Sequence, residues 1–291
     1  MKPARFTYHA PNSLAEACEM LAEHGEEGEV IAGGQSLVPV MNFRLAQPAK
    51  LIDINNIGEL AQIRIEGDRL VVGALARHAE IQRSALVAEN FSILVDAAAH
   101  IGHLPIRERG TIGGSLANAD PAAEWSLMAC LLDAEIAIAS QRGERKTEAG
   151  AFIQSVYTTD LEADELLTGI SFPCLECGEG WSLKQVRRRV GDFAIVSIAA
   201  TLRLSPSGTI ENLRLCAGGM DVTPLRLRDI ENDAVGKSPD DQWISTVAAA
   251  AAAAGTPESD VRASGEYRRE VCGLLTERAL SEALGRAGEG R

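Results

Sequence analysis

Two glycine pairs, each followed closely by a serine, constrain this chain more than any other feature of its sequence. The first lies in residues 32–36, Ala-Gly-Gly-Gln-Ser, and the second in residues 111–115, Thr-Ile-Gly-Gly-Ser. Glycine adopts positive φ angles without strain, and without a Cβ atom it lets backbone N–H groups approach a ligand closely. Successive N–H groups in such turns bind anions, and the positive end of a following helix strengthens the attraction. Two such turns, brought together from distant parts of the chain, predict a clamp for the pyrophosphate of a dinucleotide.

Signals around each pair support this prediction. The first pair follows a strand-like run at 29–32, and Ser36 is expected to cap a helix over 37–45, with Pro39 in its first turn. The second pair leads toward a helix that ends near Leu132. Asp120 and Pro121 give a helix-start signal there, with Asp at the N-cap and Pro at the first helical position.

Other interpretations of these pairs stay open at this point. An isolated Gly-Gly pair is common in surface turns that bind nothing. Neither segment reads G-x-G-x-x-G, and the sequence contains no G-x-x-x-x-G-K-[ST], so an ordinary Rossmann or P-loop site is disfavoured. The G-x-S-x-G pattern of serine hydrolases is also absent.

Hydrophobic periodicity and turn residues predict a mixed order of helices and strands. Helices are predicted near 13–25, 37–45, 78–88, 91–101, 225–232, 241–254 and 266–285. Strands are predicted near 29–32, 50–54, 70–74, 135–139, 167–172, 181–187, 195–204 and 212–216. Residues 173–180, rich in proline, glycine and acidic side chains, are expected to form a domain boundary.

Composition narrows the class of protein. The chain has 291 residues and a formal net charge of −13, which disfavours nucleic-acid and anionic membrane surfaces as partners. No apolar run approaches the ~20 residues that cross a bilayer, and no apolar signal segment follows Met1. The six cysteines are scattered rather than spaced as a disulfide framework. We therefore expect a reduced, cytoplasmic protein.

Several residue groups invite a chemical role, and we assign no catalytic residue and no metal ligand to them. Cys174 and Cys177 have redox or zinc spacing, but no second pair completes a site. His100 and His103 lack a clear carboxylate partner, so local packing is the simpler interpretation. The basic run Arg187–Arg189 is either a solvated face or subunit contact, or a group near cofactor phosphates.

The order of these motifs resembles a known family. The resemblance rests on the following segments: 32–37 (Ala-Gly-Gly-Gln-Ser-Leu), 51–54 (Leu-Ile-Asp-Ile), 109–117 (Arg-Gly-Thr-Ile-Gly-Gly-Ser-Leu-Ala), 119–122 (Ala-Asp-Pro-Ala), 166–168 before Pro173, Lys184 and 266–268 (Glu-Tyr-Arg). Together they resemble the FAD-binding medium subunit of molybdenum hydroxylases, of the carbon monoxide dehydrogenase, xanthine dehydrogenase and N-heterocycle hydroxylase type. The resemblance spans nearly the whole chain. It departs from the family at 105–108, Pro-Ile-Arg-Glu, where relatives often have Gln-Val/Ile-Arg-Asn.

The resemblance implies an α+β fold. It consists of a two-lobed FAD-binding domain of the vanillyl-alcohol-oxidase-like (PCMH) type, with lobes at 1–55 and 56–177, and a smaller α+β domain at 178–291 of the carbon monoxide dehydrogenase flavoprotein type. It also implies the residues that contact FAD. These are Ala32, Gly33, Gly34, Gln35, Ser36, Ile101, Thr111, Ile112, Gly113, Gly114, Ser115, Glu124, Leu167 and Lys184. Glu124 matches a residue that binds the ribityl or nearby hydroxyls, and Leu167 and Lys184 match contacts to the flavin ring.

The same resemblance implies an electron-transfer role within a larger enzyme. The expected partners are a small iron–sulfur subunit and a large molybdopterin subunit, assembled as a dimer of heterotrimers, with the substrate site on another chain. Carbon monoxide, a purine, a pyridine or other N-heterocycle, and an aldehyde all remain possible substrates, and the terminal acceptor is open. Two alternatives also remain: a nucleotide-binding module without redox function, and a stand-alone flavin oxidoreductase.

Overall fold

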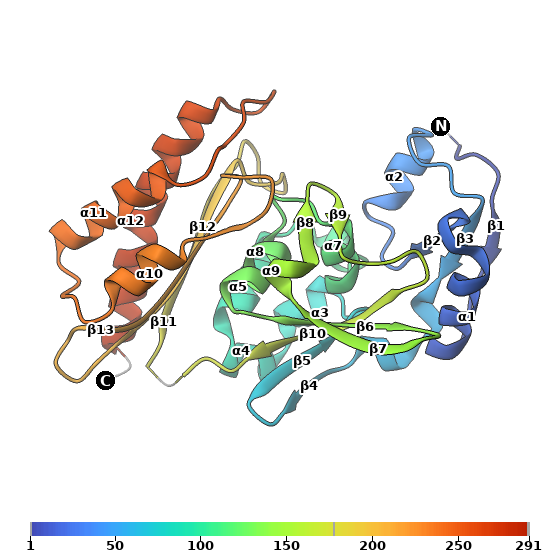
Figure 1. The fold of residues 1–291 in the computed structure, drawn as a ribbon, viewed down its shortest axis with the longest axis horizontal. Helices are drawn as coiled ribbons and strands as arrows, with labels where there is room; N and C mark the ends of the chain where they lie inside the picture. The colour runs from blue at the N-terminus through green and yellow to red at the C-terminus, as the bar shows by residue number, and fades with distance from the viewer. Residues whose placement is uncertain (1, 177, 290–291) are drawn as a thin grey trace.

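Three sheets follow one another along the molecule, as the ribbon in Figure 1 shows from right to left. The computed structural model describes residues 2–176 and 178–289. The first sheet is parallel, in the order β1 (Thr7–His9), β3 (Lys50–Asp53), β2 (Gly28–Ile31). It carries α1 (Leu14–His24) and α2 (Leu37–Asn42). The 3-10 turns η1 (Gly25–Glu27), η2 (Ile54–Asn56) and η3 (Gly58–Ala61) connect these elements to one another and to the next sheet.

The predicted helix at 13–25 is confirmed as α1, and its ends have clear causes. The Ser13 hydroxyl accepts a hydrogen bond from the Glu16 N–H, which satisfies a free donor of the first turn. Ala17 and Leu21 lie on the buried face and pack against Ile52 of the sheet. The helix ends at Gly25, whose φ of 50° a glycine adopts at little cost.

The second sheet is antiparallel, in the order β4 (Ile63–Glu66), β5 (Arg69–Gly73), β10 (Leu166–Pro173), β6 (Glu135–Ser140), β7 (Gly143–Glu148). The helices of this region are α3 (His78–Arg83), α4 (Ala85–Asn90), α5 (Ser92–His100), α6 (Leu104–Arg107), α7 (Ile112–Asn118), α8 (Glu124–Leu131) and α9 (Ala149–Phe152). A short ribbon, β8 (Ile153–Ser155) and β9 (Thr158–Thr159), follows α9.

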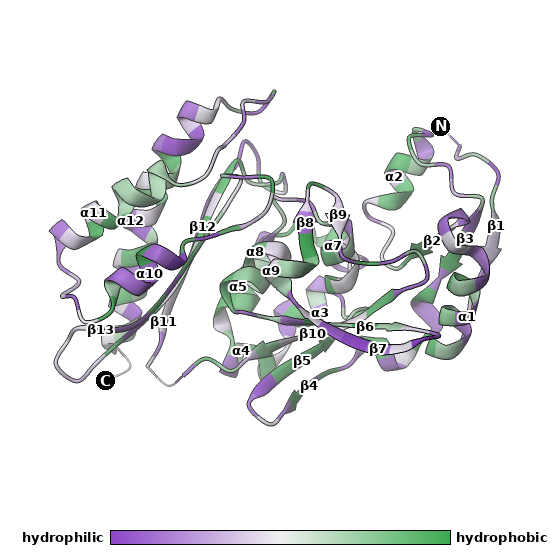
Figure 2. Ribbon diagram, viewed as in Figure 1, coloured by the Kyte–Doolittle hydropathy of each residue, from purple (hydrophilic) through white to green (hydrophobic). Residues whose placement is uncertain are grey.

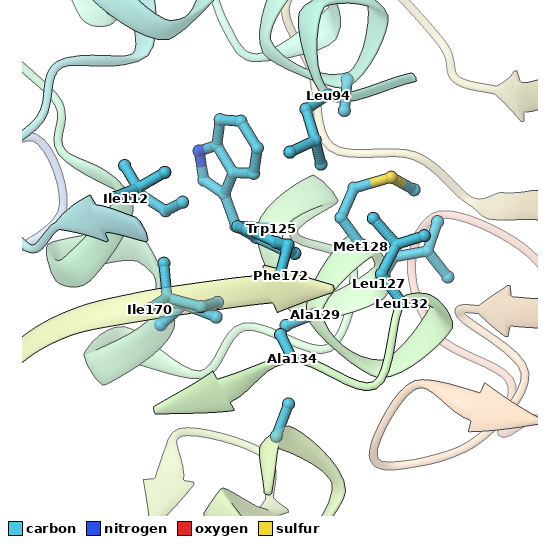
Figure 3. Close-up of a cluster of buried hydrophobic side chains, with 14 of the residues drawn as sticks. Leu94, Ile112, Trp125, Leu127, Met128, Ala129, Leu132, Ala134, Ile170 and Phe172 are labelled. Carbon is cyan, nitrogen blue, oxygen red and sulfur yellow. The ribbon is translucent and has the colours of Figure 1, made fainter. Parts of the chain in front are cut away.

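The core of this region is centred on the fully buried Trp125 of α8. Figure 3 shows its indole among side chains from α5, α7 and β10, including Leu94, Ile112 and Ile170. Because an indole buries a large apolar area, this contact fixes α8 against the sheet. The outer strand β7 is instead hydrophilic in Figure 2, and charged side chains of this kind protect an edge strand from pairing with other chains.

The third sheet is antiparallel, in the order β11 (Gly180–Val186), β12 (Val196–Leu204), β13 (Ile210–Gly218), β14 (Leu225–Arg226). The helices α10 (Arg228–Ala234), α11 (Asp241–Ala253) and α12 (Gly265–Glu289) lie on its outer side in Figure 1. Along β12, Ile198 and Ala200 join the core beneath α11 and α12, whereas Ala199 joins the core that contains Trp125. The third sheet is therefore buried on both faces.

The structure corrects several predicted boundaries. The predicted helix at 37–45 ends at Asn42, and the Ser36 side chain makes no capping hydrogen bond. The second glycine pair lies inside the first turn of α7 rather than in a loop. Asp120 does not begin α8, which starts at Glu124 after Ala123; its carboxylate instead accepts from the Ala122 N–H in a local turn.

Other differences arise from single residues and from charged strands. The predicted helix at 78–88 divides into α3 and α4 because Ser84 leaves the helical conformation and caps the second helix. The predicted helices at 225–232 and 266–285 correspond to α10 and to the longer α12. Strands β4 and β7 were not predicted: β4 alternates over only four residues, and β7 contains no apolar residues that could alternate with its charged ones. Cys177 lies outside the described residues. No helix within 2–176 and 178–289 is long and apolar enough to cross a membrane.

Asp133 joins the second region to the third. It follows α8 with a φ of 49°, and its carboxylate accepts from Arg226 at 3.0 Å and from Arg228 at 2.8 Å. Arg214 of β13 approaches the same carboxylate at 3.8 Å. Three cations from the third sheet and α10 therefore meet one anion of the second region.

We predict that Asp133→Asn lowers the free energy of unfolding by about 1 kcal/mol, because it removes the anion that these three guanidinium groups share. Urea denaturation at low ionic strength measures the change, and it should shrink in about 1 M NaCl, where salt screens the charges. Asp68→Asn is the matched control, since Asp68 is exposed and forms no salt bridge with another described residue. Equal effects of the two substitutions would contradict the prediction.

Candidate functional site

The two glycine segments, residues 32–36 and 111–115, lie against each other. A Cβ atom on Gly33 would lie 2.3 Å from the Arg109 carbonyl oxygen and 2.7 Å from the Gly110 Cα. A Cβ atom on Gly114 would lie 3.9 Å from the Ala32 Cβ. The backbones approach so closely at Gly33 that only glycine fits, which brings together segments that the sequence keeps far apart.

The first glycine segment presents unused donors. Gly34 has a φ of +68°, and the Gln35 amide donates to the Gly33 carbonyl at 3.0 Å, which holds the turn open. Within residues 2–176 and 178–289, the backbone N–H groups of Gly34, Gln35 and Ser36 donate to no acceptor. Successive free N–H groups before a helix form a cradle for an anion.

The second glycine segment is built differently. The Thr111 hydroxyl accepts from the Gly114 N–H at 3.1 Å, and the Gly113 N–H donates to Ala74 at 2.9 Å. A Cβ atom on Gly113 would lie 2.5 Å from the Ala74 Cβ, so this glycine serves the contact between α7 and the end of β5. Gly114 is exposed. The second segment therefore forms a closely packed first turn of α7 that is exposed at Gly114. Most of its backbone N–H groups already donate to acceptors within the protein.

Arg77 links the two segments. Its guanidinium donates to the Arg109 carbonyl and, at 2.6 Å, to the Asn55 amide oxygen. The Asn55 amide in turn donates to the Ala32 carbonyl at 2.8 Å. Burial and the nearby Arg109 lower the pKa of Arg77, yet a guanidinium remains charged in proteins. Neither Arg77 nor Asn55 was predicted from the sequence as a site residue. The one sequence signal was the position of Asn55, directly after the Leu-Ile-Asp-Ile segment.

His78 packs beneath Gly110, the residue just before the second glycine segment. Its Nδ1 accepts from the Trp125 indole N–H at 2.9 Å, which assigns the ring proton to Nε2. Burial, together with repulsion from Arg77 and Arg107, lowers the pKa of His78 to about 3. Its backbone N–H donates to the Gly110 carbonyl at 3.1 Å. A neutral imidazole therefore lies beneath the turn that meets Gly33.

A buried carboxyl marks the other end of the site. Glu124, the first residue of α8, is 4% exposed, and its Oε1 accepts from the Gln185 amide of β11 at 3.2 Å. Burial raises the pKa of Glu124. Arg187 follows the same strand and donates to the His100 carbonyl at 2.8 Å. The second and third sheets therefore meet at a carboxyl that can bind hydroxyl groups.

The remaining residues predicted to contact FAD lie in different parts of the fold. Ile101 follows α5 and packs half-buried against the core around Trp125, and Leu167 is buried beside a bulge of β10. Lys184 pairs at 2.5 Å with Glu282 of α12, so it lies on the opposite face of β11 from Gln185. Within the described ranges, no group of three or more histidine, cysteine or acidic residues is arranged to hold a metal ion.

Two family models match the chain. The FAD binding domain in molybdopterin dehydrogenase matches residues 4–175, more than half of the chain, and the CO dehydrogenase flavoprotein C-terminal domain matches residues 181–283. The chain is an FAD-binding medium subunit of the molybdenum hydroxylase family. This medium subunit is an oxidoreductase component with the α+β fold that its sequence predicted.

Named relatives match this medium subunit from end to end. It is 38% identical to the 6-hydroxypseudooxynicotine dehydrogenase complex subunit alpha of Paenarthrobacter nicotinovorans, over 99% of this chain and 97% of the relative. The structure of carbon monoxide dehydrogenase from Hydrogenophaga pseudoflava superposes with a TM-score of 0.95 at 35% identity, covering 98% of this chain and 99% of that chain. Quinoline 2-oxidoreductase from Pseudomonas putida 86 superposes with a TM-score of 0.94 at 35% identity, covering 99% of both chains.

The site of this medium subunit suits FAD. The free N–H groups of Gly34, Gln35 and Ser36 suit a pyrophosphate, and the nearby guanidinium groups of Arg77 and Arg109 favour an anion there. A hydrogen bond to a ribityl hydroxyl needs a group that can donate or accept, and the buried Glu124 carboxyl is such a group.

The neutral His78 makes the stability of the medium subunit depend on pH. Between pH 6.5 and about 3, the unfolded chain binds a proton at this residue that the native chain does not bind. Lowering the pH through this window should therefore remove up to about 1.4 kcal/mol of unfolding free energy per pH unit. In His78→Asn, whose amide oxygen can accept from Trp125, this contribution should vanish. Urea denaturation over the same pH range tests this, and an unchanged slope in the variant would contradict it.

Proposed function

We propose that this medium subunit carries electrons through bound FAD, from iron–sulfur clusters on a partner subunit to an external acceptor. The observation that carries the proposal is the meeting of the two glycine segments at Gly33, with free N–H donors beside it. Bound FAD would supply redox chemistry that couples one-electron donors to a two-electron acceptor, and this chain would contribute binding, orientation and electrostatics.

The first glycine segment is proposed to hold the pyrophosphate. Its free N–H groups donate to phosphate oxygens, and Arg77 and Arg109 add positive charge without a salt-bridge partner among the described residues. The second segment packs across it, and the Thr111 and Ser115 side chains and the open face at Gly114 complete the enclosure. The engaged N–H groups of α7 make this second side a support rather than the main source of donors.

The flavin end is proposed to lie toward Glu124. The carboxyl binds ribityl hydroxyls while Gln185 holds it from the third sheet. Ile101 and Leu167 supply apolar contacts to the ring system. Lys184 is proposed to act indirectly: its ion pair with Glu282 fixes β11 against α12, and the strand then presents Gln185 to the site.

We propose the domain division 1–55, 56–177 and 178–291 and, as partners, a small iron–sulfur subunit and a large molybdopterin subunit, assembled as a dimer of heterotrimers. Related proteins are named as medium chains or as subunits of dehydrogenase complexes, which supports the proposal. The substrate is then oxidised on another chain.

Gly33→Ala should lower FAD affinity by about 10- to 100-fold, because its methyl carbon would separate the two glycine segments and overpacking costs about 1–3 kcal/mol. The measurement is the flavin absorbance per chain of the purified complex after dialysis, with FAD titration of the depleted protein. Gly150→Ala is the matched control, because its Cβ atom would meet nothing within 4 Å. Unchanged FAD content in Gly33→Ala would place the pyrophosphate elsewhere.

Affinity purification of the tagged chain from its native host tests the function as a whole. The expected result is one FAD per chain, with a small iron-containing and a large molybdenum-containing polypeptide identified by mass spectrometry and metal analysis. A chain that purifies alone, with substrate-dependent bleaching of its flavin, would instead be a stand-alone oxidoreductase. A chain without flavin would be a nucleotide-binding module.

A further inference from the structure

Four arginines gather at one end of the third sheet without a carboxylate partner. They are Arg187, Arg188, Arg189 and Arg262, named here the arginine cluster. Arg187 and Arg188 donate to backbone carbonyl groups, and within 2–176 and 178–289 none of the four forms a salt bridge. The chain has 41 acidic against 28 basic residues, and Arg142, Arg145 and Arg226 all pair with carboxylates. Unpaired cations concentrated in an acidic protein indicate a surface for an anion.

A cavity of about 390 Å³ opens within this cluster. Its lining residues are Arg188, Gly191, Asp192, Phe193, Ile195 and Arg262. This volume falls within the range of small-molecule pockets. Phe193 is 41% exposed and lines the cavity together with Arg188 and Arg262. The cavity therefore combines an apolar ring surface with positive charge.

The walls of the cavity are fixed by the protein itself. Arg188 donates to the Val261 and Arg262 carbonyls at 2.8 and 2.7 Å, which ties the β11–β12 connection to the α11–α12 connection. Gly191, with a φ of +90°, packs so closely on His103 that a Cβ atom would lie 2.6 Å from the ring. The Arg262 side chain makes no hydrogen bond or salt bridge with another described residue. One wall is thus held rigid, and the Arg262 guanidinium is left for a ligand.

The cavity adjoins the flavin end of the proposed site. Gln185, which holds Glu124, lies two residues before Arg187 and three before Arg188. Arg187 contacts His100 at the end of α5, and Gly191 contacts His103 just before α6. Figure 1 shows the β11–β12 connection at this end of the third sheet, facing the second region. A molecule in the cavity would therefore lie next to the end of the site where Glu124 is buried.

We propose that this cavity is the binding site of the external electron acceptor, and that it selects a small ring-containing molecule with one anionic group. Arg262 and Arg188 bind the anionic group, and Phe193 stacks on the ring. The inference rests on the proposed function. For a quinone acceptor, two electrons and two protons pass from the reduced flavin, which is reoxidised, to the quinone, which becomes the hydroquinone. Asp192 is the acidic lining residue, and it should oppose acceptors with more than one negative charge.

Two quinones that share a ring system but differ in charge test the proposal on the purified complex. The probes are 1,4-naphthoquinone-2-sulfonate, an anion, and 2-methyl-1,4-naphthoquinone, which is neutral. Binding of each probe to the oxidised complex is measured by isothermal titration calorimetry. Reoxidation of the photoreduced flavin is followed separately by stopped-flow absorbance.

Arg262→Gln should weaken sulfonate binding about 10-fold, the loss expected for one charge-assisted hydrogen bond, and should leave the neutral quinone unaffected. Arg189→Gln is the matched control, because it removes the same charge from a residue that does not line the cavity. It should change sulfonate binding less than about 2-fold. Asp192→Asn should tighten sulfonate binding. The half-saturating sulfonate concentration for flavin reoxidation should follow the same order.

If Arg262→Gln and Arg189→Gln weakened sulfonate binding equally, the arginine cluster would act only by long-range attraction of the anion. That result would overturn the proposed site. Equal losses for both quinones would assign Arg262 a structural role and would also overturn it. A complex without a flavin that photoreduces and reoxidises would refute the proposed function instead. The calorimetric measurement, which needs no electron transfer, separates these two failures.

Discussion

The architecture depends on one backbone contact, where Gly33 meets the Arg109 carbonyl and Gly110. The first and second sheets also share a small apolar core, in which Leu75 and Leu166 of the second region pack against Ile52. At this contact the chain admits no side chain, so the distance between the segments is set by backbone atoms. Arg77 holds the alignment through the Arg109 carbonyl and Asn55, and the half-buried guanidinium is stabilised by the acceptors it joins. Removal of any part of this link would shift the donors of the first segment relative to α7.

The third sheet completes the site at an energetic cost. Because β12 is buried on both faces, the sheet is fixed between α12 and the core around Trp125, and β11 presents Gln185 to Glu124. Burying a carboxyl disfavours its charged form, which raises its pKa, and one amide hydrogen bond offsets only part of that cost. A carboxyl kept in such surroundings is better explained by a ligand with hydroxyl groups than by stability of the fold. The arginine cluster follows the same pattern, since its cations form no salt bridge with a carboxylate of the described residues.

The sequence allowed much of the fold and part of the site to be predicted, for identifiable reasons. Glycine pairs mark close approach, and apolar periodicity marked α1, β5 and β12, so these elements were found. Arg77 and His78 were missed because their roles depend on partners far away in sequence, Asn55 and Trp125. The ring contact that the resemblance implies for Lys184 stays a prediction; the structure adds that Lys184 pairs with Glu282, while Gln185, on the opposite face of β11, donates to Glu124. Sequence order gives neither the face of a strand nor which N–H groups of α7 are already engaged.

The unequal hydrogen bonding of the two glycine segments has a thermodynamic consequence. The N–H groups of Gly113 and Gly114 donate to acceptors within the protein, so the first turn of α7 needs no ligand to satisfy them. Those of Gly34, Gln35 and Ser36 donate to no acceptor in the part of the chain that the structure describes, so a ligand or water can accept from them. In the proposed site, the ordering entropy of binding then falls mainly on the first segment, because its N–H groups gain their acceptors only from the ligand. The affinity for FAD then depends on how far residues 34–36 are ordered before binding. Substitutions that stiffen these residues would tighten binding without adding a contact.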